Sequence, residues 1–121
     1  MCLSWVSEVR VRPKKVYKVV VGVSSGLVTP YWSVAVAAGA RQERAWPGNI
    51  RAASGQVYPT GIHCYTTWDA AAEAVRYCEA AAVLSSSNFG TILAEGVEGM
   101  ERVVVLDWVV WEAAHDPMGD R

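Results

Sequence analysis

The chain has 121 residues, the length of one domain, and its 52% hydrophobic and 19% charged residues exclude a disordered protein. Its three cysteines are odd in number and lack metal-site spacing, so we expect neither a disulfide framework nor a bound metal. No secretory segment is recognisable at the start, and no apolar run is long enough to span a membrane. We therefore expect a single cytoplasmic domain, residues 1–121, without membrane contact.

Charge is distributed unevenly along the chain, although the formal net charge is only −1. Residues 1–60 carry eight Lys or Arg and two Glu, a net +6, whereas residues 61–121 carry three Arg and ten acids, a net −7. Such complementary halves can pair within one fold or head to tail between copies. Six Trp supply more apolar surface than a monomer easily buries, so we expect a homo-oligomer. The acidic half argues against duplex DNA as a partner.

The first predicted element is a strand over residues 16–23, which are β-branched and apolar around Tyr17 and Lys18. Residues 24–26 are expected to turn, and residues 27–29 to return as the start of a hairpin. Five cations precede or enter the strand: Arg10, Arg12, Lys14, Lys15 and Lys18. Their cluster fits either a solvated edge strand guarded by lysines or a groove that faces phosphate.

In the middle of the chain, hydrophobic periodicity predicts secondary structure less clearly. Residues 31–38 fit either a second strand or a short helix, because Pro30 interrupts the sequence before them. Residues 39–60 contain three Gly and two Pro among few apolar residues. This composition predicts a long irregular loop, of the kind that serves as a lid over a site.

A turn, a strand and a helix are predicted next. Gly61 ends the turn, and residues 62–65 alternate as a strand that carries His63 and Tyr65. A Thr and an Asp three positions apart then form a capping pair, so the principal helix is predicted over about residues 67–82. Its small alanine face would allow close packing on a sheet.

The last elements are predicted as strands. Residues 89–94 form one strand, residues 96–99 a turn, and residues 102–112 a long central strand that is apolar on both faces. Asp107 interrupts this apolar pattern, and a buried carboxylate is costly unless it is paired. We expect a cationic partner, with a catalytic acid of raised pKa as the alternative. The candidate partners are Arg10, Arg12, Lys14 and Lys18.

Together these elements predict an α+β domain in which one principal helix packs on a mostly antiparallel sheet. The serine-rich residues 85–88 are expected to form a flexible linker. Residues 115–121, which contain a Pro and a Gly, are expected to form a flexible tail.

The segment Gly61-Ile62-His63-Cys64-Tyr65, with the alanines of residues 71–74 and Tyr77-Cys78 after it, is similar to two motifs of a known family. It resembles the Gly-Ile-Tyr-Phe-Ala and Ser-Ala-Asn-Tyr-Cys segments of the poly(ADP-ribose) polymerase branch of ADP-ribosyltransferases. In that family this strand and helix form one wall of the NAD pocket, which implies an ADP-ribosyltransferase-like core with His63 and Tyr77 facing the ligand. The family's His-Gly corresponds here to Tyr17-Lys18, and no later Glu stands in a recognisable motif, so the resemblance implies binding without catalysis.

A second resemblance extends over more of the chain. Met1-Cys2-Leu3, Val16-Tyr17-Lys18-Val19-Val20, Thr29-Pro30-Tyr31 and Gly61-Ile62-His63 resemble the motifs of short uncharacterised reading frames from phages and bacteria. Those proteins typically show Tyr-Lys-Val, Ser-Pro-Tyr and Gly-Phe-His. The resemblance implies a phage accessory protein that acts against host defence.

The expected function is non-catalytic binding of a nucleotide or an NAD-derived small molecule, without a cofactor, a metal or a catalytic residue. Lys18 would face phosphate, and the aromatic side chains would stack on a base. The residues expected to line the site are Tyr17, Lys18, Gly61, His63, Tyr65 and Tyr77.

Each of these residues also has a structural explanation. His63 is then a strand histidine bonded to a backbone carbonyl group, and Gly61 serves only its turn. Two other functions remain open. An active ADP-ribosyltransferase would consume NAD, whereas a protein-binding inhibitor of a host complex would need no pocket and would expose at least one tryptophan in a patch. The candidates are Trp32, Trp46 and Trp111.

Overall fold

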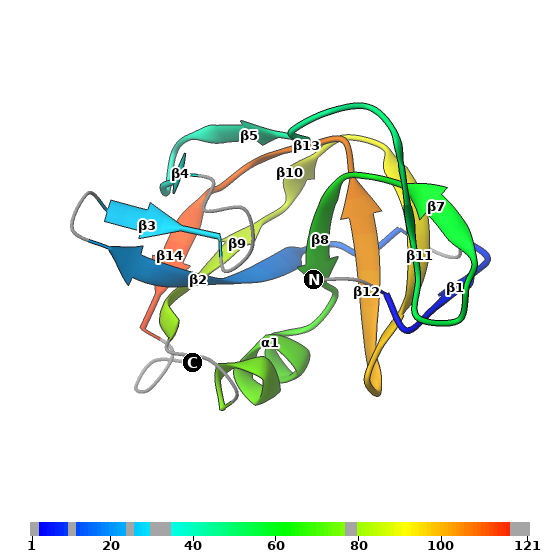
Figure 1. Ribbon diagram of the computed structural model, residues 1–121. Helices are drawn as coiled ribbons and strands as arrows, with labels where there is room; N and C mark the ends of the chain where they lie inside the picture. Colours follow the sequence, from blue (N-terminus) through cyan, green and yellow to red (C-terminus); the bar gives the residue numbers. More distant parts are fainter. Residues whose placement is uncertain (1–2, 10–11, 24–25, 30–34, 77–79, 117–121) are drawn as a thin grey trace.

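The computed structural model describes residues 3–9, 12–23, 26–29, 35–76 and 80–116 (Figure 1). Over these residues the chain is a mostly antiparallel β-sheet protein with one short helix, α1 (Trp68–Val75). The strands are β1 (Trp5–Ser7), β2 (Val16–Val23), β3 (Gly26–Val28), β4 (Ala35–Val36), β5 (Arg41–Glu43), β6 (Asn49–Arg51), β7 (Val57–Pro59), β8 (Ile62–Tyr65), β9 (Ala80–Ser86), β10 (Asn88–Phe89), β11 (Ile92–Glu98), β12 (Glu101–Leu106), β13 (Trp108–Val110) and β14 (Ala113–His115).

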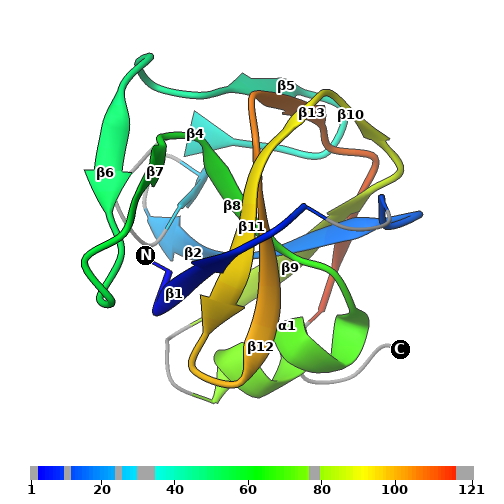
Figure 2. The ribbon, with the colours of Figure 1, turned by 90° about the vertical axis from the view of Figure 1, so that its right-hand side faces the viewer.

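Most strands belong to one sheet. Its order is β1-β11-β12-β8-β2-β3-β4, with β9 also paired to β2 and β14 paired to β9. A second sheet has the order β10-β13-β5, and β6 pairs with β7. Figure 2 shows β1, β11 and β12 nearest the viewer, with β2 and β9 crossing behind them. All recorded pairings among the described strands are antiparallel, which confirms the predicted kind of sheet.

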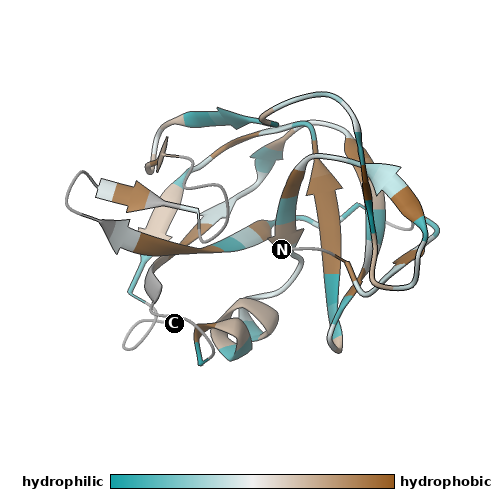
Figure 3. Cartoon of the chain, in the orientation of Figure 1, coloured by the Kyte–Doolittle hydropathy of each residue, from teal (hydrophilic) through white to brown (hydrophobic). Residues whose placement is uncertain are grey.

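Both faces of the central strand β12 are buried. Val103 and Val105 on one face, and Val104 and Leu106 on the other, are 0% exposed. Each such side chain contributes roughly 1.5 to 3 kcal/mol by leaving water. Figure 3 shows β12 as hydrophobic over most of its length and hydrophilic only near its start. The prediction of a central strand that is apolar on both faces is confirmed for these residues.

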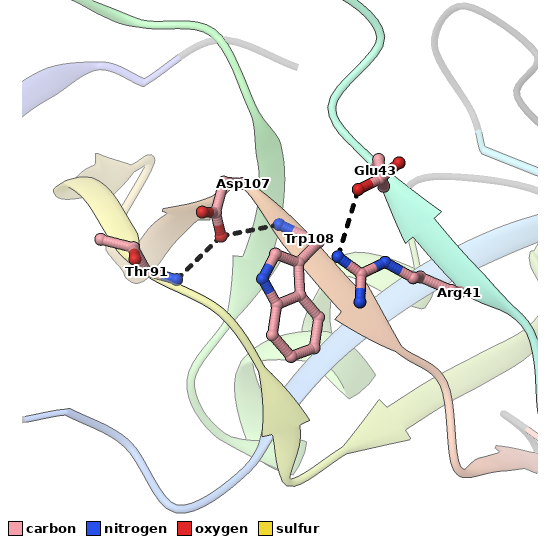
Figure 4. A network of polar contacts seen from close by, with 5 residues as sticks. All are labelled: Arg41, Glu43, Thr91, Asp107 and Trp108. Carbon is pink, nitrogen blue, oxygen red and sulfur yellow. Dashed lines mark hydrogen bonds and ion pairs between the residues drawn. The ribbon is translucent and has the colours of Figure 1, made fainter.

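The single strand predicted for residues 102–112 is instead divided at Asp107. β12 ends at Leu106, and β13 begins at Trp108 in the second sheet. The Asp107 carboxylate accepts hydrogen bonds from the backbone N–H groups of Thr91 and Trp108, both at 2.8 Å (Figure 4). It supplies the acceptors that these two N–H groups would otherwise find in a neighbouring strand.

The cationic partner expected for Asp107 is not found among the described residues. Lys18 and Arg12 donate to backbone carbonyl groups instead, Lys14 is exposed, and Arg10 lies outside the described residues. The prediction was wrong because the carboxylate lies at a strand break and is only partly buried there, so two backbone donors suffice.

The structure also differs from the predictions for the two neighbouring segments, residues 89–94 and 96–99. The strand predicted over residues 89–94 is divided next to Gly90, where a side chain would collide because its Cβ atom would lie 2.2 Å from Oδ1 of Asp107. The turn predicted over residues 96–99 begins later, since β11 continues to Glu98. Strand breaks that depend on close tertiary approach leave little trace in local periodicity.

The helix is shorter than the predicted span of about residues 67–82. It ends at Val75, and Ala80 begins β9, which pairs along β2. Alanine favours helix intrinsically, but pairing with a neighbouring strand prevails over this weak preference. The Thr67 side chain caps the helix by accepting a hydrogen bond from the Ala70 backbone N–H at 3.1 Å.

Three predicted irregular segments contain regular structure. Residues 39–60, expected to be a long loop, include β5, β6 and β7. Residues 85–86, expected to belong to a linker, end β9 and are buried. His115, expected to begin a flexible tail, lies in β14, whereas residues 117–121 lie outside the described residues. Strands of three residues are too short to show a recognisable alternation in sequence.

We predict that Asp107→Ala lowers the free energy of unfolding by about 1 to 3 kcal/mol, because the partly buried N–H group of Trp108 and the exposed N–H group of Thr91 lose their acceptor. Asp107→Asn is the matched control, since its side-chain oxygen can still accept both hydrogen bonds. Urea unfolding measures both variants. Equal destabilisation by Ala and Asn would contradict the role assigned to the carboxylate oxygen.

Candidate functional site

Five of the six residues predicted to line a ligand site lie at one junction, where β2 meets β8. The two strands pair at a single recorded position, with Tyr17 opposite Tyr65. Gly61 directly precedes β8, and Tyr77 lies outside the described residues. Among these five, Lys18, His63 and Tyr65 are buried, whereas Tyr17 and Gly61 are partly buried.

Both ring nitrogens of His63 are bonded within the protein. Nδ1 lies 3.2 Å from the Gly61 carbonyl oxygen, which can only accept, so Nδ1 carries the proton. Nε2 lies 2.9 Å from the hydroxyl group of Tyr58, which in turn accepts from the Leu3 backbone N–H at 3.0 Å. The Tyr58 hydroxyl therefore donates to Nε2. The hydrogen bonds assign His63 as a neutral imidazole.

The surroundings of His63 oppose its protonation. Burial, and secondarily the positive charge of Lys18, lower its pKa from 6.5 to about 4. A protonated ring would also place a second donor opposite the Tyr58 hydroxyl, which already accepts from Leu3. His63 is thus suited to a fixed neutral ring and not to proton transfer near neutral pH.

Lys18 occupies the space where β2 and β8 diverge. Its ammonium group donates to the His63 carbonyl oxygen at 2.9 Å, just beyond the position where Tyr17 pairs with Tyr65. The side chain therefore satisfies a carbonyl group that a continued strand ladder would have satisfied. Burial lowers the pKa of Lys18, while the negative charge of Glu98 acts in the opposite direction. An amine held in this way is not directed toward a phosphate in solvent.

Tyr65 and Gly61 are also engaged inside the protein. The Tyr65 hydroxyl group donates to the carboxylate of Glu98 at 3.5 Å, and burial raises the pKa of Glu98. A Cβ atom at position 61 would lie 2.6 Å from the Leu106 carbonyl oxygen. Gly61 is therefore required by the close approach of β12, and not by the approach of a ligand.

We call Leu3, Lys18, Tyr58, His63 and Tyr65 the β2–β8 cluster. Its hydrogen bonds join the amino-terminal segment, β7, β8 and β2. Lys18, His63 and Tyr65 were predicted from the sequence. Tyr58 and the Leu3 N–H group were not, because nothing in local periodicity brings position 3 to position 58. The arrangement matches the structural explanation for His63, in which the ring is bonded to a backbone carbonyl group.

Tyr17 differs from the other predicted residues because its ring faces the helix. It meets Trp68 edge to face with ring centroids 6.1 Å apart, and Trp68 meets His115 in the same manner at 5.4 Å. The Ser85 hydroxyl lies 2.9 Å from Nε2 of His115. The aromatic edges fasten α1 to the sheet, which is a packing role.

The described surface also carries exposed apolar side chains, and three of them lie on β1 or on segments that are hydrogen-bonded next to it. Trp5 is 56% exposed, Val57 is 57% exposed and Met100 is 96% exposed. We call these three residues the edge patch. Exposed large apolar side chains are candidates for contact with a partner.

Hydrogen bonds on either side of Trp5 connect β1 to the segments that carry Val57 and Met100. The Gln56 side chain bonds both the N–H and the carbonyl group of Val6, at 2.8 and 3.1 Å, and Val57 follows Gln56 in the chain. The Ser4 hydroxyl accepts from the Gly99 N–H at 3.1 Å, in the turn that presents Met100. Gly99 has φ 62°, a conformation that favours glycine.

The tryptophans named from the sequence behave differently. Trp111 is fully buried and its indole N–H donates to the Gln42 side chain at 3.0 Å, so it cannot contribute to an exposed patch. Trp46 is exposed, and Trp32 lies outside the described residues. Trp5 was missed, because a strand of three residues at the start of the chain gives no periodic signal.

Two classes of site receive no support from the described residues. No group of three or more His, Cys, Asp or Glu in this part of the chain is arranged to hold a metal ion. α1 has eight residues, too few to cross a bilayer, and no other described helix is long enough to do so.

Comparison of the chain with protein-family models, curated proteins and solved structures found no match. Across the described ranges, the architecture is a mostly antiparallel β-sheet with one short helix.

We predict that stability falls as pH is lowered through the range from 6.5 to about 4. In this window the unfolded chain binds a proton at His63 that the folded protein excludes, so acid favours unfolding. The free energy of unfolding should fall by roughly 2 to 3 kcal/mol between about pH 7 and about pH 4.5 through this group. Urea unfolding at a series of pH values measures the effect.

The two histidines provide the control for this experiment. His63→Gln removes the excluded proton, so the variant should be less stable at neutral pH but should lose less further stability on acidification. His115→Gln leaves His63 in place and should keep the wild-type dependence. An undiminished acid loss in His63→Gln would contradict the assignment.

Proposed function

We propose that the protein acts without catalysis, by binding a protein partner through the edge patch. Support comes from the exposure of Trp5 on β1 and of Val57 and Met100 on the segments bonded next to it. Tryptophan is enriched among the residues that dominate binding energies at protein interfaces. This proposal corresponds to the protein-binding alternative reached from the sequence, with Trp5 as its centre.

Binding of a nucleotide or an NAD-derived molecule, on an α+β core like that of the ADP-ribosyltransferases, is the competing proposal. It requires Lys18 and His63 to exchange their present bonds for bonds to a ligand. Both side chains are buried, and their polar atoms already have partners within the protein. Leaving such groups unpaired costs about 1 to 3 kcal/mol each, so the geometry favours protein binding.

The resemblance to short phage reading frames supplies the context of the proposal. A phage accessory protein acts in the host cytoplasm, so we propose a host protein, and specifically a component of host defence, as the partner. The partner should present an apolar surface to Trp5.

We predict that Trp5→Ser combined with Val57→Ser lowers capture of the partner from a bacterial lysate by at least about tenfold, because both changes remove apolar contact area. The full chain is immobilised, and captured protein is quantified by mass spectrometry. Trp46→Ser is the control, since this exposed tryptophan lies at the other end of the β6–β7 hairpin. Capture that is unchanged in the double variant, or lost equally in the control, would contradict the proposal.

A further inference from the structure

The second sheet has a free edge at β5. Among the described strands, β5 pairs only with β13, on one side. The Arg44 N–H donates to the Asp107 carbonyl oxygen at 2.9 Å, which fixes the positions that exchange hydrogen bonds along this pair. Because these positions alternate, Gln42 is bonded to β13, whereas the backbone N–H and carbonyl groups of Arg41 and Glu43 point away from it.

Side chains protect two other sheet edges against an added strand, but not this one. The Gln56 side chain bonds both backbone polar groups of Val6 in the edge strand β1. The Arg12 guanidinium donates to the Phe89 carbonyl group at the edge of β10. The outward backbone groups of β5 receive no such bond from any described residue, and Figures 1 and 2 both place β5 at the margin of the molecule. An exposed row of unpaired N–H and carbonyl groups is able to pair with another strand.

The side chains of β5 determine which strand would fit. Arg41 and Glu43 lie on the exposed face of the strand. Gln42 points the opposite way, where its side chain accepts a hydrogen bond from the Trp111 indole N–H. Arg41 and Glu43 form an ion pair at 3.2 Å, and the Arg41 guanidinium also lies over the Trp108 ring (Figure 4). β5 therefore presents one positive and one negative charge in a fixed order on one face.

This order is complementary to itself in an antiparallel pair. When Gln42 of one copy stands opposite Gln42 of a second copy, Arg41 of each copy stands opposite Glu43 of the other. In this register the outward N–H and carbonyl groups of Arg41 exchange both hydrogen bonds with those of Glu43 across the pair. Opposite charges that stand directly across two strands stabilise their pairing. The ion pair within each copy is retained, so the four charges alternate in sign around the two-fold axis.

We propose that β5 pairs antiparallel with β5 of a second copy of this chain, centred on Gln42, and joins the two three-stranded sheets into one continuous sheet. The inference gives the homo-oligomer expected from the sequence a specific contact. It does not rest on the proposed function, because β5 contains no residue of the edge patch. The dimer and the capture of a partner through Trp5 are therefore tested separately.

Analytical ultracentrifugation of the full chain over a range of concentrations tests the dimer. Arg41→Glu and Glu43→Arg should each raise the dissociation constant by about tenfold or more, because each leaves four like charges at the contact. The double variant exchanges the two charges and should recover most of the affinity. An equimolar mixture of the two single variants should also form a dimer, since each copy then supplies the charge that the other lacks.

Glu43→Pro tests the backbone hydrogen bonds. Proline removes the outward N–H group of residue 43, which the ladder to β13 does not use, so the sheet within each copy should remain intact. Glu43→Ala is the matched control, because it removes the same charge and keeps the N–H group. The dissociation constant of the Pro variant should exceed that of the Ala variant by about tenfold or more.

Amide hydrogen exchange locates the contact in the wild-type chain. Exchange of the Arg41 and Glu43 amides should slow as the concentration rises through the dissociation constant. Arg76→Glu and Glu73→Arg reverse the charges of an exposed ion pair on α1, and both control variants should dimerise like the wild type.

A chain that stays monomeric at all concentrations would overturn the inference. A dimer in which the Arg41 and Glu43 amides exchange equally fast at all concentrations would do so too, because it would use another surface. Charge-reversed β5 variants that dimerise like the wild type, or a mixture of them that stays monomeric, would also contradict the pairing. Hydrogen exchange of the wild type decides the question even where a variant fails to fold.

Discussion

The structure depends on the hydrogen bonds of Lys18, His63 and Tyr58, which are buried where β2 and β8 diverge. Lys18 reaches the His63 carbonyl oxygen at this point, and the His63 ring is fixed between Gly61 and Tyr58. The Tyr58 hydroxyl extends the chain of bonds to the Leu3 N–H group. Because an unpaired polar group in this interior would be costly, each bond constrains the next. The amino-terminal segment is thereby fastened against β7 and β8, and β1 takes its place at the edge of the sheet.

Because these polar groups are bonded inside the protein, the exposed surface offers the remaining candidates for binding. The residues whose types favoured a ligand site are used to hold strands together, whereas the side chains of the edge patch are mostly exposed. The same fastening that satisfies His63 also positions β1, with Trp5 between the turn at Gly99 and the hairpin at Gln56. Stability and the proposed binding are therefore linked, since loss of the hydrogen bonds of the β2–β8 cluster would release β1 and with it Trp5.

The sequence predicted those features that rest on periodicity. The antiparallel sheet, the strand over residues 62–65, the apolar faces of residues 103–106 and the start of the helix to within one residue all follow from local pattern. Prediction from the sequence failed where tertiary contacts determine the local structure. The alanines of residues 80–82, for example, form a strand because β2 lies beside them. For the site, residue types correctly brought Lys18, His63 and Tyr65 together, but only the structure reveals that their polar atoms turn toward the protein.

The central claim is that His63 is an interior, neutral imidazole whose proton lies on Nδ1. Nitrogen NMR of selectively labelled histidine, followed from about pH 7 downward, tests it most directly because the ring nitrogen shifts report both tautomer and charge. The account predicts the Nδ1–H tautomer at neutral pH and protonation only near a pKa of about 4. Titration near 6.5, or a proton on Nε2 at neutral pH, would contradict it and return His63 to consideration as a ligand-binding group.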